Sequence, residues 1–353
     1  MDLRDLVNNA ARWLSGEDDA DAMIVSCRAR LARNLSTSPF APKATLDHQE
    51  HIIDQVLGAA QKSAQMGNAA FFKVNTLQGN ERRLLVERHL ISPALAESKG
   101  QRGLLFNPDE SLSVMINEED HLRLQAILPG LQTMQAWQEV NALDDELGGV
   151  LKYAHSEQWG FLTACPTNTG TGLRVSVLIH LPALVVTEDM ERVMRGLTQM
   201  TFTVRGFYGE GSNAVGNLFQ ISNQSTMGVP EAEIVEKLSE VTRQIIAHEK
   251  EAQAALLKEA PSQVEDKVWR AYGLLEHSRV LSSQEFMNLL SAVRLGRSLG
   301  IVNGLSSGFI NQLMIITQPS HLQAEAGADL SPEERDVRRA EVVRRHLAGL
   351  SAE

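Results

Sequence analysis

The chain has 353 residues, of which 43% are hydrophobic and 22% charged, a composition typical of a soluble globular protein with a buried core. Its length exceeds that of most single domains, so we expect two domains. The net charge of −11 argues against general binding to nucleic acid or anionic membranes. Cys27 and Cys165 lack metal-type spacing, and we find no signal peptide or membrane-length apolar run, so we expect a cytoplasmic protein without a zinc site.

Apolar periodicity predicts helices and strands up to about residue 258 and helices alone beyond it. The expected helices cover residues 2–15, 46–66, 81–89, 131–147, 187–200 and 231–257, and the expected strands cover 24–31, 71–77, 103–106, 112–117, 173–181, 201–205 and 218–222. Pro261 breaks the pattern, and further helices are expected at 263–280, 283–299, 305–316 and 332–348. We therefore expect an α+β domain over 1–258 and an all-α domain over 262–353.

Arginine recurs on the polar side of these strands or just past their ends. The residues concerned are Arg28, Arg30, Arg123, Arg174 and Arg205. Guanidinium groups that share one face repel each other unless an anion lies between them. If the strands form one sheet, the five side chains converge on a polyanion, and a nucleotide triphosphate with Mg²⁺ fits. The alternative is five unrelated surface arginines.

Acidic residues gather at 117–123, where an apolar strand runs out. Leu112, Val114 and Ile116 share the apolar face of that strand, so Glu119 points off its polar side if the strand continues. The alternative is a hairpin edge of solvated charge. A second loop, residues 165–172, surrounds Cys165 with small and hydroxylic residues; an inert thiol is the alternative there. Residues 209–214 match a dinucleotide-binding pattern weakly, because no helix clearly follows them.

Four separated blocks resemble, in the family's order, the motifs of phosphagen (guanidino) kinases. They are residues 26–34, 117–123, 165–174 and 205–223. The resemblance covers about residues 20–255 and implies a large antiparallel sheet backed by helices. Unlike creatine and arginine kinases, the chain lacks their N-terminal helical domain and adds a helical C-terminal one, a layout similar to that of bacterial protein-arginine kinases.

The resemblance also implies roles for individual residues. Glu119 corresponds to the catalytic base, Glu210 to a second substrate-binding carboxylate and Cys165 to the thiol beside the guanidinium. The five arginines correspond to the clamp on the ATP phosphates, and His121 to a contact with the base or ribose. Thr167, Asn168 and Gly209 fall in the substrate loops.

The chemistry agrees with these roles independently. The pKa of an arginine guanidinium lies far above 7, so populating its neutral, nucleophilic form at pH 7 costs about 9 kcal/mol. A carboxylate cannot remove the proton in advance, but it can accept it as nitrogen bonds to phosphorus if the geometry is fixed. Two carboxylates, one on each edge of the planar guanidinium, suit this task.

Near the C-terminus, residues 331–340 begin with a capping box made by Ser331 and Glu334. Arg335 and Arg339 share a helix face beside Asp336, and spacing alone favours a solvated helix. The string resembles the motif by which protein-arginine kinases bind phosphoarginine, which implies regulation by product and self-assembly into a homo-oligomer.

We therefore predict an ATP-dependent kinase that phosphorylates arginine side chains of proteins. A kinase for a free guanidino metabolite is the second candidate, and a phosphoarginine-binding adaptor without catalysis is the third. The substrates are proteins with exposed arginine. By resemblance, the further partners are an activator protein, a stress-response repressor and a protease machine, with no membrane or direct nucleic-acid contact.

Overall fold

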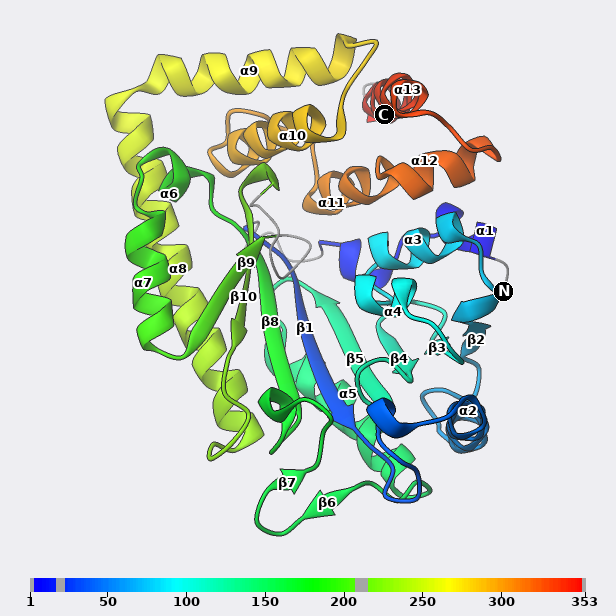
Figure 1. Ribbon diagram of the computed structural model, residues 1–353. Helices are drawn as coiled ribbons and strands as arrows, with labels where there is room; N and C mark the ends of the chain where they lie inside the picture. The colour runs from blue at the N-terminus through cyan, green and yellow to red at the C-terminus, as the bar shows by residue number, and fades with distance from the viewer. Residues whose placement is uncertain (1–2, 17–22, 207–214, 351–353) are drawn as a thin grey trace.

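A large antiparallel sheet organises the computed structural model, which describes residues 3–16, 23–206 and 215–350. Within these residues the sheet has eight strands in the order β2-β3-β4-β5-β1-β8-β10-β9 (Figure 1). The strands are β1 (Ile24–Arg33), β2 (Ala70–Lys73), β3 (Gly103–Phe106), β4 (Leu112–Ile116), β5 (Leu122–Pro129), β8 (Leu173–His180), β9 (Phe202–Gly206) and β10 (Leu218–Asn223). The predicted fold class is thereby confirmed.

One face of the sheet is apolar and covered by helices. Cys27, Ala29 and Leu31 of β1 are fully buried on this face. They belong to a core shared with α2 (Leu46–Ala60), α5 (Thr133–Gly148) and α8 (Glu231–Glu259). Because side chains alternate along a strand, this burial leaves Ser26, Arg28 and Arg30 of β1 on the opposite, polar face.

Shorter elements surround the sheet. They are α1 (Leu3–Asn8), α3 (Gly79–Glu87), α4 (Pro93–Glu97), α6 (Pro182–Val186), α7 (Met190–Gln199) and a separate hairpin of β6 (His155–Ser156) and β7 (Gly160–Phe161). In the described part of the chain, no helix is both long and apolar enough to cross a membrane.

The C-terminal helices lie above one end of the sheet (Figure 1). They are α9 (Pro261–His277), α10 (Ser283–Ser298), α11 (Ser307–Ile316), α12 (Pro319–Ala326) and α13 (Pro332–Leu350). Their core includes Val25, Ile127 and Leu178 of the sheet. A buried polar contact joins the two parts, since the His180 Nε2 atom lies 2.8 Å from the Ser291 hydroxyl of α10.

Several elements differ from the sequence predictions. The patterns missed β5, α4, α6, α12 and the β6–β7 hairpin, and the predicted N-terminal helix is instead α1 followed by a 3₁₀ turn at 12–14. The strand 112–117 does not continue to Glu119, because it ends at Ile116 and Asn117 turns the chain with a φ of 61°. Glu119 therefore belongs to the turn between β4 and β5.

Candidate active site

A cavity of about 570 Å³ opens on the polar face of the sheet. The predicted site residues that line it are Arg28 and Arg30 of β1, Arg123 of β5, Arg174 of β8, Arg205 of β9, and Glu119, Cys165, Thr167 and Asn168 of the connecting segments. The sheet thus brings the five arginines together with a carboxylate and a thiol, as the sequence pattern required.

Strand register explains how the arginines converge. Arg30 of β1 pairs directly with Arg174 of β8, and like charges at such positions destabilise a sheet. Burial, with Arg174 and Arg123 nearby, lowers the pKa of Arg28 to about 10. Burial and the neighbouring arginines also lower the pKa of Arg30, whose Nε is a buried donor without a hydrogen-bond partner. A bound polyanion would relieve both the repulsion and the unmet donor.

Polar side chains of β10 support two of these arginines. The Arg28 Nη2 atom donates to Oε1 of Gln220 at 3.3 Å, and the Arg174 Nη2 atom donates to the Ser222 hydroxyl at 3.2 Å. Since both contacts come from β10, which is paired on both sides by β8 and β9, they orient the two guanidinium groups from a rigid support.

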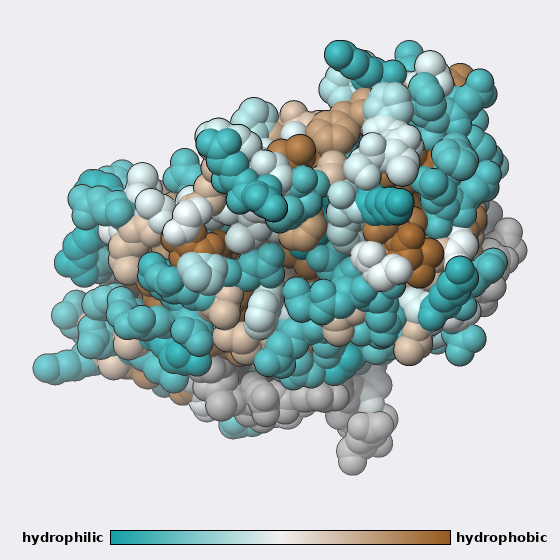
Figure 2. Space-filling model, turned by 90° about the horizontal axis from the view of Figure 1, so that it is seen from below, coloured by the Kyte–Doolittle hydropathy of each residue, from teal (hydrophilic) through white to brown (hydrophobic). Residues whose placement is uncertain are grey.

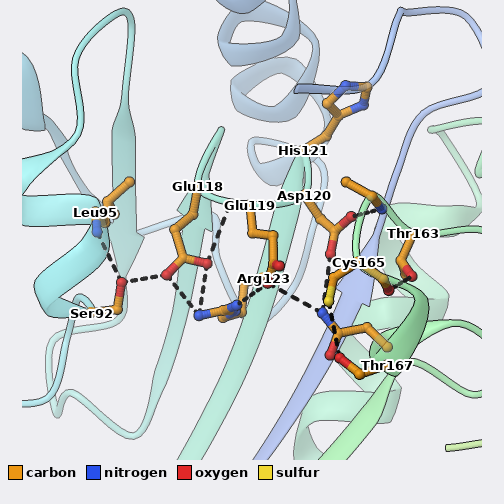
Figure 3. A network of polar contacts seen from close by, with 12 residues as sticks. Ser92, Leu95, Glu118, Glu119, Asp120, His121, Arg123, Thr163, Cys165 and Thr167 are labelled. Carbon is orange, nitrogen blue, oxygen red and sulfur yellow. Dashed lines mark hydrogen bonds and ion pairs between the residues drawn. The ribbon is translucent and has the colours of Figure 1, made fainter. Parts of the chain in front are cut away.

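The turn between β4 and β5 carries two neighbouring glutamates, one buried and one partly exposed (Figure 3). Glu118, whose side chain is only 5% exposed, lies 2.7 Å from the Arg123 guanidinium and also accepts a hydrogen bond from the Ser92 hydroxyl. Glu119 is 43% exposed and lies 3.4 Å from Arg123. Because Glu118 makes the closer, buried ion pair with Arg123, the Glu119 carboxylate is left open towards the cavity.

Asp120, which the sequence reasoning did not single out, joins this turn to the loop of Cys165. Its Oδ1 atom accepts from the Asn34 side chain at 2.6 Å and from the Ala164 backbone N–H at 2.7 Å. In the same loop, the Cys165 Sγ atom lies 3.0 Å from the Thr167 hydroxyl. Asn168 completes the link, since its side chain donates to Glu119 at 3.4 Å.

His121 does not line this cavity. It is 1% exposed; its Nδ1 atom accepts from the Leu35 N–H and its Nε2 atom contacts the Pro39 carbonyl, both at 3.0 Å. Burial lowers the pKa of His121, so its ring is neutral at pH 7. Its predicted contact with a nucleotide is therefore wrong for this arrangement, because backbone groups occupy both nitrogens. Gly209 and Glu210 lie outside the described residues.

The C-terminal motif is divided between two environments. Arg335 lines a second cavity, of about 680 Å³, together with residues of α3, α4 and α12. Arg339 is 1% exposed and donates to the carbonyls of Thr317 and Leu281 and to Asp336. The predicted contact of Arg339 with phosphoarginine therefore needs correction, because its guanidinium is buried and holds neighbouring segments together. The predicted capping box is confirmed by both of its hydrogen bonds.

Comparison with known proteins agrees with this geometry. Residues 50–252 match the family model of the ATP:guanido phosphotransferase C-terminal catalytic domain, and residues 261–353 match that of the protein-arginine kinase McsB C-terminal domain. The fold is similar to that of lombricine kinase, with a TM-score of 0.59 and 23% identity over 72% of each chain. It is also similar to that of a duplicated taurocyamine kinase from Schistosoma mansoni, with a TM-score of 0.60 and 21% identity over 76% of this chain and 42% of that one. The fold and the catalytic domain are those of an ATP:guanido phosphotransferase.

Full-length relatives narrow this class. The chain is 46% identical to a protein-arginine kinase of Desulforamulus reducens over all of both chains. It is 45% identical to that of Halothermothrix orenii, over 98% of this chain and 99% of the relative, and 44% identical to that of Bacillus subtilis, over 98% and 96%. The chain belongs to the protein-arginine kinase family.

Proposed function

We propose that this protein transfers the γ-phosphoryl group of ATP to arginine side chains of proteins. The observation that carries the proposal is the cavity in which five arginines from four strands meet the open carboxylate of Glu119. Family membership agrees with it, because the full-length relatives are protein-arginine kinases.

The arginine cluster binds the phosphates of ATP. Arg30 and Arg174 face each other across β1 and β8, so a phosphate chain between them replaces repulsion by charge-assisted hydrogen bonds. The ATP would be bound as its Mg²⁺ complex, in which the ion would offset further phosphate charge. Fixed guanidinium groups stabilise charge on the transferred phosphoryl group without reorganising during the reaction.

Glu119 acts as the general base. The acceptor nitrogen bonds to the γ-phosphorus while the bond from phosphorus to the bridging oxygen breaks; ADP leaves, and the proton passes to the Glu119 carboxylate. Glu118 supports this role by pairing with Arg123, which would otherwise compete with the substrate guanidinium for Glu119. Cys165 is proposed to position the acceptor together with Thr167 and Asn168. Glu210, next to Gly209 in the sequence, is proposed to hold the opposite edge of the acceptor guanidinium.

The cavity that Arg335 lines is proposed to bind phosphoarginine. Arg82, Arg83 and Glu87 also line it, so it offers groups of both signs to a ligand that carries a phosphate and a guanidinium nitrogen. Arg339 is buried and already paired with Asp336, so we assign the phosphate contact to Arg335. We still predict that this cavity controls activity and that the protein forms a homo-oligomer. The predicted partners remain an activator, a stress-response repressor and a protease machine. Cys27 and Cys165 are both unpaired, which supports a reducing, cytoplasmic location.

The test incubates the protein with Mg²⁺ and γ-labelled ATP together with free arginine and an unfolded, arginine-rich protein. We expect acid-labile label on the protein, since a phosphorus–nitrogen bond is formed. Label on free arginine alone would instead identify a guanidino-metabolite kinase. No label on either acceptor, with ATP still bound, would identify a binding protein without catalysis.

A further inference from the structure

The β6–β7 hairpin carries an exposed tryptophan close in sequence to the loop that contains Cys165, which we call the acceptor loop. Trp159, in the turn between the strands, is 50% exposed, and Glu157 beside it is also exposed. The hairpin projects below the sheet, near the end of β1 (Figure 1). Seen from below, hydrophobic residues form small groups among hydrophilic ones rather than one broad patch (Figure 2).

Backbone contacts fix the hairpin to the loop that contains Cys165. Phe161 of β7 exchanges two backbone hydrogen bonds with Gly170, with N–O distances of 2.8 and 3.2 Å. Gly160 has a φ of +72°, and a Cβ atom there would lie 2.5 Å from the Gly170 oxygen, so only glycine permits this approach. The hairpin and residues 162–170 thus form one closed unit, part of which lines the catalytic cavity.

The base of the hairpin is held as firmly. The centre of the Phe161 ring lies 3.5 Å from the guanidinium carbon of Arg33, which is itself buried and paired with Asp144 at 2.6 Å. The rings of Tyr153 and His155 pack edge-on against Phe161. The strands on either side of Trp159 are therefore held in place by buried contacts. A rigid aromatic side chain loses little entropy on binding, which is why such residues dominate many interfaces.

We propose that Trp159, with Glu157, is a docking site for the polypeptide segment next to the target arginine of a protein substrate. The proposal rests on the function above. Trp159 and Cys165 are six residues apart, so their separation is at most about 20 Å, a distance that about six residues of extended substrate can bridge. The indole face suits an apolar side chain or a second arginine of that segment, and Glu157 adds attraction for basic residues. A free guanidino compound has no such segment.

The test compares Trp159→Ser with Trp269→Ser, a matched control on α9 whose indole is 51% exposed. The acceptors are fluorescein-labelled lysozyme, kept unfolded by reduction and alkylation, and a single arginine blocked at both ends. For Trp159→Ser we expect about a tenfold rise in both KM and Kd for the unfolded protein, as for truncation of an aromatic contact residue. The Kd for ATP and any rate on blocked arginine stay unchanged. Trp269→Ser matches the wild type throughout, and Trp159→Phe restores most of the affinity.

Two results would overturn docking while leaving the kinase function intact. One is an unchanged KM and Kd for the unfolded protein in Trp159→Ser. The other is an equal loss on both acceptors or a weakened affinity for ATP, which would mean that Trp159 only supports the acceptor loop. A wild-type protein that binds ATP but labels neither acceptor would refute the proposed function, and docking with it.

Discussion

Replacement of Asp120 should loosen the connection between the β4–β5 turn, which carries Glu119, and the loop that contains Cys165. The Asp120 carboxylate is 2% exposed and accepts two short hydrogen bonds, from Asn34 and from the Ala164 N–H. Hydrogen bonds to charged groups contribute about 1.5–3 kcal/mol each, and neutral ones about 1 kcal/mol. Asp120→Asn keeps both bonds in neutral form, so we expect a loss of about 2 kcal/mol in the free energy of unfolding. Asp120→Ala removes both and should cost about 4 kcal/mol.

The same substitutions should lower activity in the protein that remains folded. A displacement of about 1 Å between Glu119 and the Cys165 loop can cost about a hundredfold in rate, so we expect kcat to fall by at least about tenfold in Asp120→Asn. The Kd for ATP should change less than twofold. Urea unfolding, ATP titration and turnover at a temperature where the variant is folded measure these quantities. Asp266→Asn, at an exposed aspartate of α9, is the control. Wild-type stability and kcat in Asp120→Asn would refute the reasoning.

Arg339→Ala should lower the free energy of unfolding by about 3 kcal/mol or more, because buried acceptors lose their donor. Arg335→Ala should leave urea unfolding nearly unchanged but abolish calorimetric binding of free phosphoarginine. Lost binding in Arg339→Ala with unchanged stability, and lost stability in Arg335→Ala, would contradict the different roles of the two arginines. Burial and nearby Arg294 lower the pKa of His180 well below its usual value, so the unfolded chain binds a proton there that the folded protein does not. Stability should therefore fall as pH drops through about 6.5, by about 1 kcal/mol from His180 between pH 7 and 5.5. His180→Asn should reduce the slope by that share, and the other buried histidines, such as His121 and His321, should keep the rest of it. An unchanged slope would show that His180 is protonated in the fold.

The alternation of polar and apolar residues makes the arginine face predictable, because a period of two fixes which side chains share a face. That period alone puts Arg28 and Arg30 on the same side of β1. Strand order is not contained in the pattern, so the pairing of Arg30 with Arg174 follows only from the neighbouring positions of β1 and β8. The missed strand β5 does carry a signal, since its leucines alternate with Arg123 and Gln125, but the charged turn in front of it obscures the pattern.

Roles that depend on distant partners could not be read from the sequence. Asp120 binds groups 86 and 44 residues away, and His121 is held by backbone atoms 86 and 82 residues away. Arg339 likewise carries the same charge as Arg335, yet only its contacts with the distant carbonyls of Leu281 and Thr317 show that it is buried while Arg335 lines a cavity.

Glu119→Gln tests the central claim most directly, because it keeps the shape of the side chain and removes the proton acceptor. Acid-labile phosphate on an unfolded, arginine-rich protein measures turnover, and equilibrium titration measures the Kd for ATP. The proposed mechanism predicts a fall in kcat of about 10²–10⁴-fold, typical for loss of a general base, with the Kd for ATP changed less than twofold. Turnover within a few-fold of the wild type would contradict it.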